Sequence, residues 1–138
     1  MKRIFLDANV LFTAAHNPQG KAALIIDSGR DGHWLLYSSA YAVAEARYNL
    51  GIKCPERLPG LEMLLDNIRI IKHLEKKSSL PGLAEKDQPI FQAALECSAT
   101  HLVTGDKRDF GKFMNKPGET FGIIIQTPTD FLKELLLD

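Results

Sequence analysis

The sequence contains little cysteine, and its two cysteines lie far apart. Cys54 and Cys97 form no CxxC pair, which argues against a disulfide framework and against a structural zinc site. We interpret both thiols as ordinary packed or surface side chains. A reducing, cytoplasmic location fits this cysteine usage best.

The sequence also lacks a net charge of either sign. Seventeen lysines and arginines balance seventeen aspartates and glutamates, which gives a formal net charge of +0. This balance excludes a strongly basic coat for nucleic acid. Any contact with nucleic acid must therefore come from a local basic patch or from a bound metal ion.

Long hydrophobic runs and several well-known catalytic motifs are missing as well. No stretch approaches the roughly 20 apolar residues of a membrane helix. The apolar start Ile4-Phe5-Leu6 ends at Asp7, well short of the roughly 7–15 residues of a signal-peptide core. The sequence contains no GxSxG, GxxxxGKS or GxGxxG pattern, so it gives no support for a serine hydrolase or a nucleotide-binding protein. Its histidines show no HxH or HxxxH spacing, so we give them ordinary core or surface roles.

The sequence instead has the length and composition of one ordinary globular domain, which we expect to span residues 1–138. It is 45% hydrophobic and 25% charged. Strand-like and helix-like segments alternate along it. The predicted strands are Arg3–Leu6, Trp34–Tyr37, Ile68–Ile71, His101–Thr104 and Gly122–Ile125. The predicted helices are Asn9–His16, Lys21–Arg30, Leu61–Asn67, one after Asp87 and one from Thr127. A further helix begins at Ser38 or Ser39 as its N-terminal cap and runs to about Leu50, with Gly51 as its C-terminal cap. Residues 76–79 are predicted to form a polar loop.

This alternation predicts an α/β fold with a parallel sheet. Strands separated by helices form right-handed crossovers, which place helices on both faces of the sheet. The short apolar runs Ile68–Ile71 and Ile123–Ile125 are typical of strands that are buried on two sides.

Several acidic residues occupy the ends of these elements. Asp7 follows the first strand, Asp106 follows the fourth, and Asp87 begins the helix that leads into the fourth. Glu45 lies among alanines and a valine on the helix after the second strand, where a buried glutamate is costly unless it is paired or bound to a metal. Ligands of such sheets bind beyond the carboxyl ends of the strands, where the strand order reverses.

Each acid alone could cap a helix or face the solvent, but the four together indicate a metal site. Four carboxylates at close range repel one another and resist ionising together. A divalent cation removes this repulsion, and ligands that are all oxygen favour Mg²⁺ or Mn²⁺.

The sequence resembles the PIN-domain nucleases over nearly its whole length. The resemblance lies in Leu6-Asp7-Ala8-Asn9-Val10-Leu11, in Glu45, in 87–95 (DQPIFQAAL), in 102–110 (LVTGDKRDF) and in the closing 127–132 (TPTDFL). It implies a three-layer α/β/α fold with a five-stranded parallel sheet of order 3-2-1-4-5. It also implies a Mg²⁺- or Mn²⁺-dependent endoribonuclease that cleaves single-stranded RNA with a metal-activated water and leaves a 5′-phosphate and a 3′-hydroxyl.

The resemblance assigns roles to individual residues. The acidic quartet of the family corresponds to Asp7, Glu45, Asp87 and Asp106, which are the implied catalytic residues and metal ligands. Asp109 is a fifth possible ligand. Asn9 and Thr104 stand where polar groups that support the ligands are expected.

Many single-domain members of this size are VapC-like toxins of toxin–antitoxin pairs, while others have no toxic role. The implied partners are therefore an RNA substrate and an antitoxin protein, with no membrane. We also expect a homodimer, because apolar helical faces around Tyr41, Tyr48, Met63 and Leu64 exceed what a core of this size covers.

Two questions remain open at this stage. Lys107, Arg108 and Lys112 follow the fourth strand and are either RNA-phosphate contacts or a solvated charged face. The chain could also be a catalytically idle PIN-like module that binds protein or nucleic acid. A phosphoacceptor receiver domain is disfavoured, because Lys72-His73 rather than an aspartate follows the third strand.

Overall fold

The computed structural model describes residues 1–74 and 79–137, so positions 76–78 of the predicted polar loop lie outside the described residues. Its centre is a five-stranded parallel sheet of order β3-β2-β1-β4-β5. This order confirms the predicted one. The strands are β1 (Arg3–Leu6), β2 (Leu35–Ser39), β3 (Arg69–Ile71), β4 (His101–Val103) and β5 (Ile124–Gln126).

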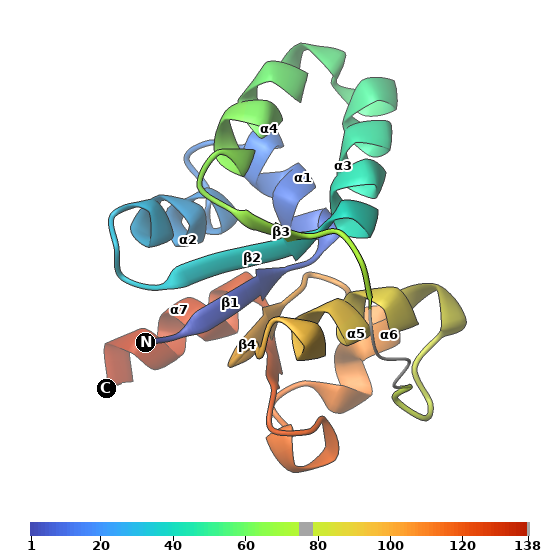
Figure 1. Cartoon of the computed structure of the whole chain (residues 1–138). Helices are drawn as coiled ribbons and strands as arrows, with labels where there is room; N and C mark the ends of the chain where they lie inside the picture. The colour runs from blue at the N-terminus through green and yellow to red at the C-terminus, as the bar shows by residue number, and fades with distance from the viewer. Residues whose placement is uncertain (75–78, 138) are drawn as a thin grey trace.

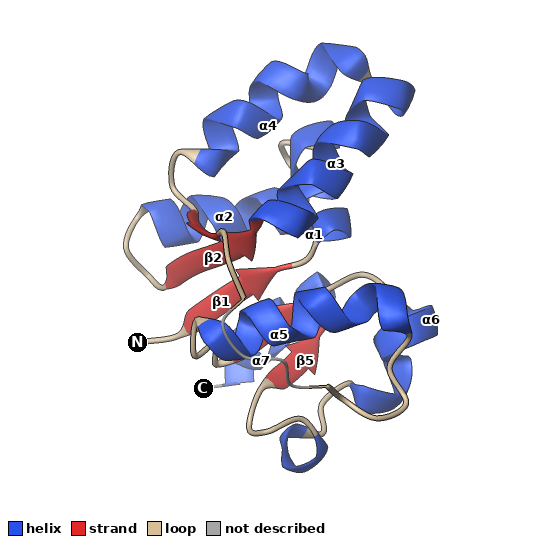
Figure 2. Ribbon diagram, turned by 45° about the vertical axis from the view of Figure 1, so that its right-hand side comes forward, coloured by secondary structure: helices blue, strands red, loops and turns tan. Residues whose placement is uncertain are grey.

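Helices fill every connection between the strands, as the alternating pattern predicts. α1 (Ala8–His16) and α2 (Lys21–Arg30) join β1 to β2, and α3 (Ala40–Lys53) and α4 (Leu58–Leu65) join β2 to β3. α5 (Gln88–Glu96) leads into β4, a short α6 (Lys107–Phe110) follows β4, and α7 (Pro128–Leu137) follows β5. Figures 1 and 2 show α1 to α4 on one side of the sheet and α5 and α6 on the other.

Several element boundaries differ from the prediction by one to three residues, and two of the differences have an identifiable reason. α3 does begin after Ser39, whose hydroxyl accepts a hydrogen bond from the Ala42 amide at 3.1 Å. Gly51 does not end α3, which continues to Lys53. The helix stops at Cys54 because Pro55 follows, and proline disfavours a helical conformation of the residue before it. β5 begins after Gly122, whose φ of +87° belongs to a turn rather than a strand.

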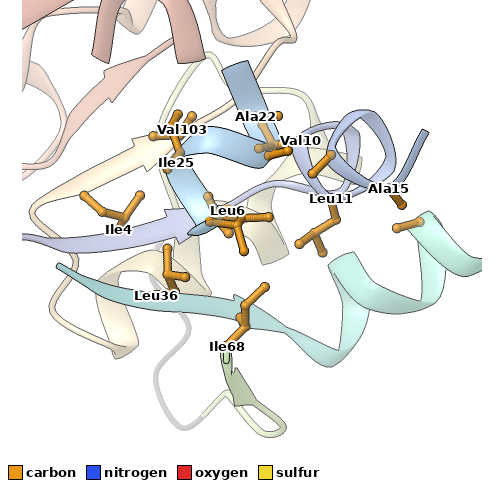
Figure 3. Close-up of a cluster of buried hydrophobic side chains, with 14 of the residues drawn as sticks. Ile4, Leu6, Val10, Leu11, Ala15, Ala22, Ile25, Leu36, Ile68 and Val103 are labelled. Carbon is orange, nitrogen blue, oxygen red and sulfur yellow. The ribbon is translucent and has the colours of Figure 1, made fainter. Parts of the chain in front are cut away.

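Two hydrophobic clusters hold the layers together, one on each face of the sheet. Figure 3 shows the first, in which Ile4 and Leu6 of β1 pack against Val10 and Leu11 of α1 and Ile25 of α2. Phe131 of α7 belongs to the same cluster. The second cluster packs β1 and β4 against α5 and α6, and it contains Phe5, Phe91, Leu102 and Phe110.

The strand β3 corrects one expectation. Burial on both faces was predicted for Ile68–Ile71, but Arg69 is exposed and Ile70 and Ile71 are only half-buried. The reason is the position of β3 at the edge of the sheet, where only one neighbour covers it. Within residues 1–74 and 79–137, no helix has the length and apolar character needed to cross a membrane.

Candidate metal centre

The strand order brings the carboxyl ends of β1 and β4 next to each other at the point where it reverses. Leu6 pairs with Val103, and the Asp7 amide donates to the Val103 carbonyl at 3.1 Å. The residues that follow the two strands, Asp7 and Thr104, therefore start side by side. This is the edge at which open α/β sheets bind their ligands.

Asp7 is a buried carboxylate with several hydrogen-bond donors. Its Oδ1 accepts from the Ala8 amide at 2.7 Å and so caps α1, while its Oδ2 accepts from the Thr104 hydroxyl at 2.8 Å. Burial raises the pKa of Asp7, and these hydrogen bonds oppose the shift. The negative charges of Glu45 and Asp106 raise the pKa of Asp7 further.

Asn9 and Thr104 connect the two strand ends. The Asn9 amide group donates to the Thr104 hydroxyl at 3.2 Å and to Asp7 Oδ2 at 3.2 Å, and its Oδ1 accepts from the Gly105 amide at 2.7 Å. The Thr104 hydroxyl also accepts from the Asp106 amide at 3.1 Å. With one donor and two acceptor positions in use, this hydroxyl is fully committed. Both residues thus contact the Asp7 carboxylate and link the ends of β1 and β4, while their role in supporting metal ligands stays a prediction.

Replacing Thr104 with Val should therefore lower the free energy of unfolding by about 1–3 kcal/mol, because buried Asp7 Oδ2 loses its shortest hydrogen bond. Urea denaturation of the metal-free protein measures this. Thr13→Val, at an exposed position of α1, is the matched control and should change stability by less than about 0.5 kcal/mol. Equal effects of the two substitutions would contradict a supporting role for Thr104.

Three other aspartates form the tightest acidic group at this edge. Asp87, Asp106 and Asp109 each offer a carboxylate oxygen, and these oxygens lie within 4.8 Å of one another. All three side chains are half-buried. Asp106 Oδ1 accepts from the Asp109 amide at 3.0 Å and thereby caps α6. Asp7 and Glu45 lie outside this close group.

Asp87 is the least satisfied member of the group. It precedes α5 but makes no side-chain capping hydrogen bond, and its Oδ2 is buried without a hydrogen-bond partner among the described residues. Burial raises the pKa of Asp87 to about 7, helped by its interaction with Asp109. A carboxylate in this position holds a proton at neutral pH or needs a cation beside it.

Lys86 supplies one positive charge at this edge. Its Nζ lies 3.1 Å from Asp109 Oδ2, and this contact lowers the pKa of Asp109. The Tyr41 hydroxyl donates to the Lys86 carbonyl at 2.9 Å. Burial and the charges of Glu45 and Asp87 raise the pKa of Tyr41. Sequence reasoning missed Lys86 at the site and gave Tyr41 only an apolar role, since neither residue carries a motif.

Glu45 differs from its expectation. The alanines and valine around it suggested a buried side chain, but Glu45 is exposed, as is Ala44 beside it. The buried side of α3 carries Ala42, Val43 and Ala46. The negative charge of Glu45 nevertheless raises the pKa of both Asp7 and Tyr41.

The arrangement fits a divalent cation. The donors are all carboxylate oxygens, which suit Mg²⁺ or Mn²⁺, and in the described part of the chain the buried Oδ2 of Asp87 has no hydrogen-bond partner. Three basic residues are predicted to contact RNA, and all three are exposed. Lys107 and Arg108 follow Asp106 directly in the chain, and Lys112 comes after α6.

Comparisons with known proteins were informative only for structures. No family model and no curated protein matches the sequence. One similar structure is a chain of VapBC2 from Rickettsia felis, solved with a DNA fragment from the VapBC2 promoter. The two chains align with a TM-score of 0.66 at 16% sequence identity, over 91% of this chain and 98% of that one. A chain of VapBC-1 from nontypeable Haemophilus influenzae aligns with a TM-score of 0.60 at 17% identity over 92% and 98%.

A third solved structure is similar too. A chain of FitAB, solved with the IR36 DNA fragment, aligns with a TM-score of 0.53 at 19% identity over 91% of this chain and 94% of that one. The three alignments each span nine-tenths of the chain, and the strand order agrees with the one that the sequence resemblance implies. The chain therefore has the three-layer α/β/α PIN-like fold, which it shares with chains of the VapBC and FitAB structures.

Proposed function

We propose that this chain is a Mg²⁺- or Mn²⁺-dependent endoribonuclease that cleaves single-stranded RNA, and that it is the toxin of a toxin–antitoxin pair in the cytoplasm. The observation that carries the proposal is the convergence of Asp87, Asp106 and Asp109 within 4.8 Å at the reversal of strand order. The likeness to chains of VapBC and FitAB structures supports the toxin assignment.

In this mechanism the three aspartates would hold the metal, with Asp7 and Glu45 adding negative charge beside them. A bound Mg²⁺ or Mn²⁺ supplies a water of lowered pKa and neutralises charge on the phosphate. Thr104 and Asn9 fix the Asp7 carboxylate, which holds the two strand ends together. Asp87, whose pKa is raised to about 7, would have to be ionised to hold such a cation, so metal binding would be coupled to loss of its proton.

Labelled RNA tests the proposal directly. Single-stranded RNA should be cleaved with Mg²⁺ or Mn²⁺ present and stay intact in chelator, while duplex RNA is cut weakly or not at all, because the neutral chain cannot grip a duplex strongly. Equal cleavage in chelator would refute the metal mechanism. If calorimetry shows no binding of Mn²⁺ or Mg²⁺ and RNA stays intact, the chain is an idle module instead.

We propose that the antitoxin docks in a groove on the side of the sheet away from α5. The groove encloses about 400 Å³ between α1, α2 and α4, with Ala14, Ala15 and Ala23 in its walls and Met63 at its rim. Asp27, Arg30 and Asp66 add charges around it. An amphipathic helix is the segment that fits an apolar groove with a charged border.

A homodimer is the state we expect in solution. Tyr48 and Ile52 of α3 and Met63 of α4 are 69%, 64% and 72% exposed, which leaves large apolar side chains without cover. Tyr41 and Leu64, which were also predicted to contribute to the apolar faces, are less exposed. Tyr41 is 45% exposed and Leu64 is half-buried. Light scattering at micromolar concentration should give twice the 15.4 kDa of one chain. The mass of a single chain at all concentrations would contradict the dimer.

A further inference from the structure

A hollow of about 440 Å³ lies directly beside the acidic group. One wall is the loop at Gly82, Leu83 and Ala84, and the other carries Arg108 and Lys112. Asp109 belongs to both the hollow and the group of three aspartates. The hollow therefore opens next to the candidate metal centre and presents two positive side chains there. Lys107, the third residue of the predicted basic patch, does not line it.

The loop wall is held in place by one side chain. Gln88, in the first turn of α5, accepts from the Leu80 amide at 2.9 Å and donates to the Leu80 carbonyl at 2.8 Å and the Leu83 carbonyl at 3.0 Å. These three hydrogen bonds fix both ends of the segment that contains Gly82. The loop faces the acidic centre from a defined position, so the hollow exists before any ligand binds.

Position 82 favours glycine because its φ is +88°, which L side chains rarely adopt. A Cβ built there would stand 3.0 Å from Lys112 Nζ, so the end of this flexible side chain lies close to the loop. Lys112 can therefore lie close against the loop backbone, where its Nζ is also 5.3 Å from the centroid of the Phe113 ring. Its positive charge is held at the wall of the hollow.

The charges of the hollow favour an anion. Among the described residues that line it, Arg108 and Lys112 are the cations and Asp109 is the acid. Lys86 already pairs with that acid at 3.1 Å, so repulsion of an incoming anion by Asp109 is weakened. An arginine guanidinium can hold a phosphate group through two parallel hydrogen bonds, and a lysine adds a point charge.

We propose that this hollow binds a backbone phosphate of the RNA, next in the strand to the phosphate at the acidic centre. The identity of the ligand rests on the ribonuclease proposal, whereas the anionic character of the ligand follows from Arg108 and Lys112. The phosphate contact positions the strand and carries no base specificity. Occupation of the hollow therefore places the adjoining phosphodiester at Asp87, Asp106 and Asp109.

Binding of a short labelled single-stranded RNA in chelator tests the proposal without any cleavage. The double variant Arg108→Gln/Lys112→Gln should bind about tenfold more weakly or worse, and the slope of log K against log salt should shrink by about 0.7 for each cation removed. Lys133→Gln, at an exposed position of α7, should bind as the wild type does. Thermal melts confirm that each variant is folded.

Two outcomes separate this proposal from the ribonuclease proposal, and a third comparison tests the phosphate site itself. If the double variant binds RNA as tightly as Lys133→Gln does, the phosphate site is refuted even though cleavage persists. If the wild type binds RNA through these two residues but never cleaves it with Mg²⁺ or Mn²⁺, the site stands and the ribonuclease fails. Single-stranded DNA of the same sequence should also bind the wild type, and the double variant should lose a similar factor in affinity for it. If inorganic phosphate binds but neither RNA nor DNA does, the proposed site for a backbone phosphate is refuted.

Discussion

Replacing Asp106 with Asn is expected to lower metal-dependent RNA cleavage by about a hundredfold or more while the protein stays folded. Asp106 belongs to the group of three carboxylates, and an amide supplies no negative charge to a cation. The substitution is mild for the fold, because Asp106 Oδ1 accepts from the Asp109 amide and the amide oxygen of Asn can accept the same hydrogen bond. The loss should therefore appear in metal binding and in rate rather than in folding.

A matched substitution separates this effect from a general change of charge. Asp31→Asn also removes one carboxylate, but at an exposed position that follows α2. It should cleave RNA at the wild-type rate. Calorimetric titration with Mn²⁺ gives the second measurement, in which Asp106→Asn should bind markedly more weakly than Asp31→Asn. Wild-type cleavage by Asp106→Asn would remove the acidic group from the proposed mechanism.

Replacing Asp87 with Asn is expected to stabilise the metal-free protein at pH 8 and to have little effect at pH 4. The pKa of Asp87 is raised to about 7, first by burial and then by Asp109, so the folded state binds more protons than the unfolded chain between about pH 4 and pH 7. Stability of the wild type therefore falls as the pH rises through this range, and the whole penalty is present above pH 7. Asn carries no charge and avoids it.

The size of the gain is set by solvent screening. Asp87 is only half-buried, so solvent screens its charge and the shift translates into a discounted gain of about 1–2 kcal/mol at pH 8. For a chain of this length that corresponds to roughly 3–8 °C in Tm. Because Asp87 and Asp109 interact, the difference between wild type and variant belongs to the pair. The raised pKa of Asp7 acts in the same direction but is common to both proteins.

Thermal melts at pH 4 and pH 8, with chelator and with Mg²⁺, measure all of this. Mg²⁺ at a hundred times its Kd should stabilise the wild type by about 2.7 kcal/mol, and the variant by much less because it has lost a ligand. An Asp87→Asn variant that melts below the wild type in chelator at pH 8 would mean that the Asp87 carboxylate stabilises the fold. In that case ionisation of Asp87 does not destabilise the metal-free protein, which contradicts its proposed role as a metal ligand.

The sequence alone determined the fold and most of the acidic edge. β1 and α2 have the predicted bounds, and the strand order is the one that the family resemblance implies. The bounds of such elements are readable because hydrophobic periodicity, caps and turns depend on residues close together in the chain, whereas the strand order was an implication of the resemblance alone. Asp7 and Asp106 were found in the same way, since each follows a recognisable strand. Once those strands are neighbours in a parallel sheet, their following residues must meet.

Only the tertiary structure decided which side chains complete the site. Glu45 proved to be exposed, because the rotation of α3 is set by what Val43 and Ala46 pack against and not by the residues beside Glu45. The hydrogen bond of Tyr41 to Lys86 and the meeting of Gly82 with Lys112 join segments that no local pattern connects. The raised pKa of Asp87 likewise depends on burial and on a neighbour from another segment. Contacts of this kind arise when separate elements pack, so their geometry exists only in the folded chain.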